Sequence, residues 1–121
     1  MSERKRRGDR GEDAVAAMLA KRGCAIEARQ YRCRWGEIDL IARTADGVLC
    51  FVEVKTRSSR AIAAPREAVT PAKQRKLRSA ASWYLVQTGQ DDCLCRFDVA
   101  EVYPADAGGR RQIKYITSAF C

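Results

Sequence analysis

The alternation of apolar and polar residues predicts a helix near the start of the chain. Within residues 9–22, Val15, Met18 and Leu19 recur at the spacing of one buried helical face. Gly23 follows directly and is a typical C-terminal stop. The basic segment before this pattern, residues 1–8, is expected to be a flexible arm.

Five later segments carry the period-two pattern and the β-branched and aromatic residues of strands. The predicted strands are residues 24–32, 35–43, 48–56, 94–103 and 112–117. The second and third are separated by Ala45, Asp46 and Gly47, a turn sequence that predicts a hairpin.

A second helix is predicted between the third and fourth strands. Thr70 is a suitable N-cap, Pro71 fits the first helical position, and the helix should end near Thr88, before Gly89. Its expected apolar face consists of Leu77, Ala80, Ala81, Tyr84 and Leu85. A strand–helix–strand connection implies parallel pairing, whereas the hairpin implies antiparallel pairing. The expected fold class is therefore α/β, with helices flanking a mixed sheet in the order α-β-β-β-α-β-β.

Composition supports one compact domain, residues 9–121, in a chain of 121 residues that is 46% hydrophobic. No apolar run reaches the roughly 20 residues of a membrane span, and no apolar stretch follows the basic N-terminus as in a signal peptide. We therefore expect a cytoplasmic protein whose six cysteines are reduced thiols, mostly small core residues rather than metal ligands. The absence of histidine excludes every catalytic triad, nucleophile pair or zinc site that needs imidazole.

The net charge of +8 is concentrated in the N-terminal segment and in a basic stripe between residues 54 and 78. Such a stripe suits a polyanion, and nucleic acid, in particular DNA, is the expected partner. The candidate phosphate-binding residues are Arg57, Lys73, Arg75 and Lys76. The alternative is an ordinary solvated helix face.

The hairpin places charged residues within apolar strands, where they cost free energy unless they are paired or bind a metal. These residues are Asp39 in one strand and Glu53 and Lys55 in the other. A two-residue turn would point Asp39 away from Glu53. A three-residue loop ending at Gly47 sets them opposite each other, and we prefer this register because it gathers the polar groups on one face.

Opposed carboxylates of Asp39 and Glu53 would hold Mg²⁺, with Mn²⁺ as a substitute, and Lys55 could orient a water and support negative charge. The alternative is a salt bridge between Glu53 and Lys55. Glu12 shares the buried face of the first helix and is a fourth candidate catalytic group, unless it only favours the helix dipole.

Five segments together resemble the YraN-like family of bacterial endonuclease-like proteins, which are related to archaeal Holliday-junction resolvases. They are Gly11-Glu12, Gly36–Ala42, Phe51–Arg57, Arg96–Val99 and Ala119-Phe120. The resemblance implies a restriction-endonuclease-like core with the PD-(D/E)XK signature. Carried over, Asp39 is the first acid, Glu53 the second, Lys55 the lysine and Glu12 the helix carboxylate. The chain departs from the family pattern at Ile38, in place of proline, near Gln30, where asparagine is expected, and near Ala63 or Ala64, where glycine is expected.

Two functions follow as hypotheses. The first is a Mg²⁺-dependent endonuclease that hydrolyses phosphodiester bonds of branched or otherwise structured DNA. The alternative is a non-catalytic nucleic-acid-binding or partner-recruiting protein that retains the nuclease fold. The residues leave open whether the protein forms a homodimer, which would present two sites to symmetric strands.

Overall fold

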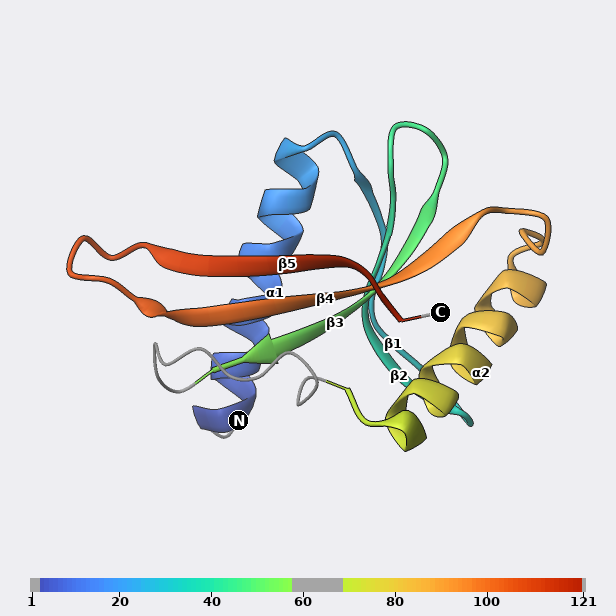
Figure 1. Cartoon of the computed structure of the whole chain (residues 1–121), viewed down its shortest axis with the longest axis horizontal. Helices are drawn as coiled ribbons and strands as arrows, with labels where there is room; N and C mark the ends of the chain where they lie inside the picture. Colours follow the sequence, from blue (N-terminus) through green and yellow to red (C-terminus); the bar gives the residue numbers. More distant parts are fainter. Residues whose placement is uncertain (1–2, 58–68, 121) are drawn as a thin grey trace.

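The computed structural model describes residues 3–57 and 69–120, with side chains from residue 10 onward. Two helices and five strands follow the predicted order, and the arrangement is consistent with a restriction-endonuclease-like fold (Figure 1). The elements are α1 (Glu3–Lys21), β1 (Ala25–Cys33), β2 (Gly36–Arg43), β3 (Leu49–Thr56), α2 (Pro71–Gln87), β4 (Cys95–Ala105) and β5 (Arg111–Phe120).

The five strands form one mixed sheet in the order β1-β2-β3-β4-β5. Strands β3 and β4 are parallel, as the intervening helix α2 predicted, and the other neighbours are antiparallel. Strand β5 is longer than expected and pairs with β4 along much of its length. Each of the three central strands therefore has a neighbouring strand along both edges. Their apolar side chains face a helix on each face of the sheet.

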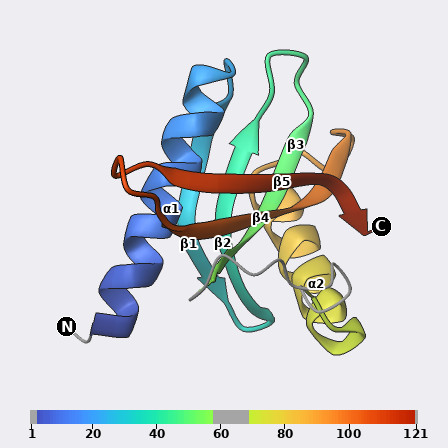
Figure 2. The same ribbon diagram turned by 60° about the vertical axis from the view of Figure 1, so that its left-hand side comes forward.

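Helices α1 and α2 lie on opposite faces of the sheet, as Figure 2 shows. On the α1 face, Val15 and Leu19 pack in a cluster that includes Val52 of β3. On the α2 face, Leu77 packs in a cluster that includes Phe51. Adjacent residues of β3 thus serve opposite cores, which is the alternation expected of a strand buried on both faces.

Helix α1 begins at Glu3, six residues before the predicted start at residue 9, and so includes most of the segment expected to be a flexible arm. The segment contains Glu3, Lys5 and three arginines, residue types with high helix propensity, and it contains no proline. Further along, Gly11 allows the helix to approach the sheet closely. A Cβ at this position would lie 2.7 Å from Oγ1 of Thr56. This close approach positions the neighbouring Glu12 against the sheet.

The hairpin between β2 and β3 has the register of the predicted three-residue loop. Leu40 pairs with Val52 and Arg43 with Leu49, and the N–H of Thr44 donates to the carbonyl of Val48 at 2.9 Å. The last loop residue is Gly47, with φ of 89°. Glycine tolerates this left-handed conformation because it has no Cβ. The register decides which side chains of the two strands can meet.

Helix α2 has the N-cap that the sequence predicts. The Thr70 hydroxyl accepts a hydrogen bond from the N–H of Lys73 at 3.2 Å, and Pro71 occupies the first turn. The buried face includes Leu77 and Tyr84, as expected from their spacing. The cap therefore fixes where α2 begins and at which helical position Lys73 lies.

The five cysteines that the structure describes are unpaired thiols. Cys50 is buried, and Cys24, Cys33 and Cys93 pack at the borders of the two cores. Cys95 is exposed, so four of these five residues contribute to packing. Neither described helix is long and apolar enough to cross a membrane.

Replacing Thr70 with alanine is expected to destabilise the protein by about 1 kcal/mol, because an N–H of the first turn loses its acceptor. Urea unfolding of the parent, Thr70→Ala and Thr70→Ser measures the effect. Serine retains the hydroxyl and should restore most of the stability. Equal losses in both variants would show that the cap is not the source.

Candidate active site

Asp39 lies where strand β2 separates from strand β3. The backbone ladder ends at Leu40 and Val52, and beyond it the N–H of Val54 donates to Oδ2 of Asp39 at 2.8 Å. This hydrogen bond directs the Asp39 carboxylate toward β3. Continued by one residue, the same register sets Asp39 opposite Glu53.

Glu53 is a buried carboxylate that meets two lysines at one oxygen. The Nζ atom of Lys55, two residues along β3, lies 3.6 Å from Oε1 of Glu53. The Nζ atom of Lys73, from the first turn of α2, lies 2.5 Å from the same oxygen. The side chain of Lys73 is partly exposed, so this ion pair sits at the border between the core and solvent.

Glu12 comes to the same end of the sheet from the opposite helix. Its side chain is buried and contacts β1, with Oε1 lying 3.7 Å from the guanidinium of Arg29 and Oε2 accepting from Nε2 of Gln30 at 3.4 Å. The register of β1 and β2 places Gln30 opposite Asp39. Gln30 has φ of 50°, a conformation that asparagine adopts more readily, which agrees with the residue expected there by resemblance.

The buried position and the charge of neighbouring groups shift the ionisation of this cluster. Burial, followed by the negative charge of Glu53, raises the pKa of Asp39 to about 7, while the N–H of Val54 opposes the shift. The charge of Glu12 also raises this pKa. Burial, followed by the hydrogen bond with Lys73, lowers the pKa of Lys55. Glu53 therefore interacts electrostatically with Asp39 and with both lysines, and Lys73 also interacts with Asp39.

The chemistry of the Asp39 and Glu53 pair is suited to a small divalent cation. Both groups are hard oxygen donors, and their negative charges repel each other. A divalent cation bound by both carboxylates would reduce this repulsion. The Lys73 ammonium already lies as a counter-cation on Glu53. Among the side chains of residues 10–57 and 69–120, no group of three or more histidines, cysteines or acids is arranged to hold a metal. Two carboxylates with water and a phosphate would make up the coordination that Mg²⁺ accepts.

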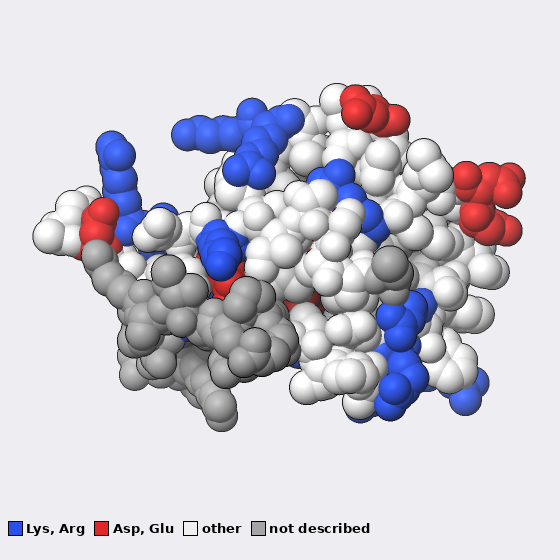
Figure 3. All heavy atoms as spheres, viewed as in Figure 1, with Lys and Arg blue, Asp and Glu red and all other residues white. Residues whose placement is uncertain are grey.

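The structure places the four predicted phosphate-binding residues in two settings. Arg75 and Lys76 are exposed on α2. Lys73 forms an ion pair with Glu53. Arg57 donates two hydrogen bonds, at 3.0 and 2.6 Å, to Oε2 of the fully buried Glu101. Figure 3 shows basic side chains gathered at the lower right, over the first part of α2. Arg75 and Lys76 are thus better placed for a polyanion than Arg57.

Lys73 is the site residue whose ion pair with Glu53 the sequence did not indicate. It occupies the first turn of α2, where the helix dipole disfavours a cation. This unfavourable position is the feature of the sequence that could have indicated an anionic partner for Lys73. Glu37, which the same hairpin register would bring toward Lys55, is exposed and lies 3.5 Å from Arg32 instead.

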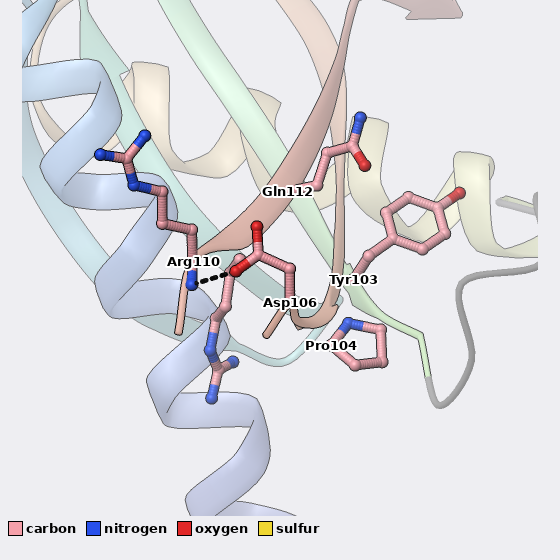
Figure 4. A pocket seen from close by; sticks show the side chains of 6 residues that line it. Tyr103, Pro104, Asp106, Arg110 and Gln112 are labelled. Carbon is pink, nitrogen blue, oxygen red and sulfur yellow. Dashed lines mark hydrogen bonds between the residues drawn. The ribbon is translucent and has the colours of Figure 1, made fainter. Parts of the chain in front are cut away.

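A small cavity of about 200 Å³ lies away from this cluster, at the hairpin between β4 and β5 (Figure 4). Its lining includes Tyr103, Gln112 and Asp106, whose carboxylate accepts from the backbone N–H of Arg110 at 2.9 Å. Neither Asp39 nor any of its charged neighbours contributes to it. The cavity therefore belongs to the hairpin and not to the candidate site.

A family model described as "Uncharacterised protein family UPF0102" matches residues 11–102, a range that contains the whole cluster. The chain belongs to the UPF0102 family. This confirms the YraN-like resemblance, and the family is a member of the PD-(D/E)XK-like nuclease superfamily.

Relatives in the family match almost end to end. The UPF0102 protein of Symbiobacterium thermophilum is 51% identical over 116 residues, which cover 96% of this chain and 97% of that protein. The UPF0102 protein of Pelobacter propionicus is 42% identical over 114 residues, which cover 93% of this chain and 81% of the relative.

Among solved structures, the chain is similar to one described as "The structure of Pyrococcus Furiosus SfsA in complex with Ca2+". The two share 11% sequence identity with a TM-score of 0.38, and the match covers 93% of this chain and 63% of the other. The chain thus spans less than two thirds of the length of that protein.

Asp39→Asn is expected to stabilise the metal-free protein at pH 8. The raised pKa means that the folded protein binds the Asp39 proton more tightly than the unfolded chain does. The parent therefore loses stability as pH rises from about 4, the unfolded pKa, through about 7, the folded one. Asparagine retains an oxygen for the N–H of Val54 and has no charge to bury. The gain at pH 8 should be on the order of 1 kcal/mol.

Urea unfolding in EDTA at pH 8 and at pH 5 measures this difference. The advantage of asparagine should shrink at pH 5, where the folded parent holds the proton. Asp46→Asn, in the exposed hairpin loop, is the matched control and should show no such trend. An advantage of Asp39→Asn that is equal at both pH values would contradict the buried charge as its cause.

Proposed function

We propose that this chain is a metal-dependent nuclease that hydrolyses phosphodiester bonds of DNA, with branched or otherwise structured DNA as the substrate. The observation that carries the proposal is the convergence of Asp39 and Glu53 with Lys55 and Lys73 at one end of the sheet. Membership of a nuclease-like family supports the same class of activity. The homodimer and the cytoplasmic location stay predictions.

Each residue of the cluster has a proposed part in hydrolysis. Asp39 and Glu53 would hold Mg²⁺, which supplies Lewis-acid polarisation of a phosphate and acidification of water. Lys55 would orient the attacking water and support the negative charge that develops on the phosphate. Its position in a partly buried site strengthens such an interaction, because solvent screens it less.

Lys73 and Glu12 would act around this centre. Lys73 must share Glu53 with an incoming cation, and its partly exposed ammonium is then available to the phosphate. Glu12 would hold Gln30 and Arg29 of β1 in place, and its charge adds to the negative field that attracts a cation. The exposed Arg75 and Lys76 would bind phosphates farther along the strand.

A second function has one observation in its favour. The ion pair between Lys73 and Glu53 already balances the buried carboxylate without a metal. A protein that keeps this fold only to bind nucleic acid or recruit a partner would need no metal in addition to this ion pair. The two functions are separated by whether a divalent cation binds and whether DNA is cut.

Glu53→Gln and Lys55→Ala should each abolish detectable cleavage while DNA binding persists. Glutamine removes a metal-binding charge, and alanine removes the group that orients water. The assay uses duplex, flap, fork and four-way DNA with Mg²⁺ or Mn²⁺. In parallel, either cation should raise the melting temperature of the parent but not that of Glu53→Gln.

Glu37→Gln is the matched control for Glu53→Gln, because Glu37 is an exposed acid of the neighbouring strand. This variant should cut DNA and respond to metal like the parent. If folded Glu53→Gln and Lys55→Ala cut normally, the activity lies at another site. A parent that binds DNA but neither cuts it nor responds to metal would favour the non-catalytic function.

Replacing Arg75 and Lys76 together with alanine should weaken DNA binding and flatten its dependence on salt. Each cation that no longer neutralises a phosphate reduces the slope of log affinity against log salt by about 0.9 for duplex DNA. Titrations at several salt concentrations in EDTA measure the slope. A double variant of Lys21 and Arg22, exposed cations of α1 and the turn after it, removes the same charge and should change the slope less. Equal changes would place the binding surface elsewhere.

A further inference from the structure

The turn between β1 and β2 presents an exposed tryptophan. Trp35 is 44% exposed, although an indole of this size normally contributes to a core or an interface. The guanidinium carbon of Arg34 lies 4.9 Å from the centre of the Trp35 ring. This cation–π contact covers part of the ring and restrains its orientation, while a large part of the indole remains open to solvent.

This turn lies at the margin of the candidate active site. Trp35 directly precedes β2, and Asp39 is four residues farther, about 13 Å along an extended strand. A Cβ on Gly36 would lie 3.6 Å from the Cβ of Lys76, so the turn contacts the first half of α2. Figure 2 shows the turn beside the start of that helix. The same part of α2 provides Lys73 to Glu53.

The charges around the ring are mainly positive. Arg34, Arg75 and Lys76 are exposed at this end of the molecule. The acid of the neighbouring strand, Glu37, lies 3.5 Å from Arg32 and is therefore balanced. An open aromatic ring among cations is the combination that binds single-stranded nucleic acid, because the cations contact phosphates while the ring stacks on a base.

We propose that Trp35, backed by Arg34, is a stacking platform for an unpaired base of the DNA strand whose phosphate enters the carboxylate–lysine cluster. The inference rests on the proposed function and names the feature of the substrate that the site recognises. A paired base is already stacked within its duplex and offers no free face to an indole. Trp35 would therefore select DNA in which a base beside the bound phosphate is unpaired, whatever the sequence.

The structure also provides a matched control. Trp83 is 43% exposed, almost the same as Trp35, and lies on α2. It follows Lys73 by ten residues, about 15 Å along the helix. Trp83→Ala therefore removes an equally exposed indole away from the cluster. Trp35→Phe retains an aromatic ring at the proposed platform.

The experiment measures binding by fluorescence anisotropy in EDTA, so that cleavage plays no part. The probes are a labelled duplex, the same duplex with a short thymine flap, and a third with abasic residues in the flap. Trp35→Ala should bind the thymine flap about tenfold more weakly than the parent, as expected for the loss of one stacked base. Its affinity for the plain duplex and for the abasic flap should not change.

The two control variants complete the prediction. Trp35→Phe should retain most of the preference for the thymine flap, and Trp83→Ala should bind all three probes like the parent. Melting temperatures verify that each variant is folded. The proposal is overturned if Trp35→Ala loses affinity for flap and duplex equally, or if the parent does not distinguish thymine from abasic flaps.

The outcome is distinguishable from failure of the proposed nuclease function. A parent that never cuts the DNA panel, but loses flap preference with Trp35→Ala, would retain the platform and disprove the nuclease. A parent that cuts with metal, but whose flap binding does not depend on Trp35, would retain the nuclease and disprove the platform.

Discussion

The register of the hairpin formed by β2 and β3 is the constraint on which the rest of the site depends. A three-residue loop closed by Gly47 aligns Leu40 with Val52, and this alignment brings the Asp39 carboxylate to the N–H of Val54. A shift of one residue would turn every side chain of one strand to the other face. The apolar residues of β3 would then lose their cores, and Asp39 would lose its position near Glu53. Packing on both faces and the geometry of the acidic pair are therefore fixed together.

The sheet buries acids in its central strands, and each is balanced in a different way. Asp98 accepts hydrogen bonds from Arg96, Tyr115 and Ser118, and Glu101 accepts two from Arg57. Such paired carboxylates suit a structural role, because buried charge is tolerated when it is paired and hydrogen-bonded. The Asp39 and Glu53 pair differs, since the charge of Glu53 raises the pKa of Asp39 and the lysines of this cluster are partly open to solvent. Asp98 and Glu101 therefore suit a role in holding the sheet together, whereas the Asp39 and Glu53 pair is open to an exchange of cations.

The same end of the molecule carries both the proposed catalytic cluster and the proposed surface for a polyanion. Helix α2 contributes Lys73 to the buried cluster, exposes Arg75 and Lys76, and supports the turn that carries Trp35. The N-cap at Thr70 sets the start of that helix and thereby the position of all three cations. Local helix geometry thus connects the proposed phosphate-binding residues to the carboxylates. The other helix, α1, reaches this end through the close approach at Gly11, which brings Glu12 to β1.

The sequence by itself determined the order of elements, the parallel pairing of β3 with β4, the hairpin register and the cap of α2. These features depend on residues close together in the chain: periodic apolar positions, a short turn and a threonine–proline helix start. It also singled out Asp39, Glu53 and Lys55, since charges in apolar strands require partners. Only the tertiary structure decided which partners they have. Lys73 meets Glu53, and Arg57 meets Glu101 rather than an open surface, because these contacts join elements that folding alone brings together. The same reasoning applied to β4 would have flagged Asp98, with Arg96 two residues away as its cation, and Glu101, whose partner Arg57 no local pattern could have named.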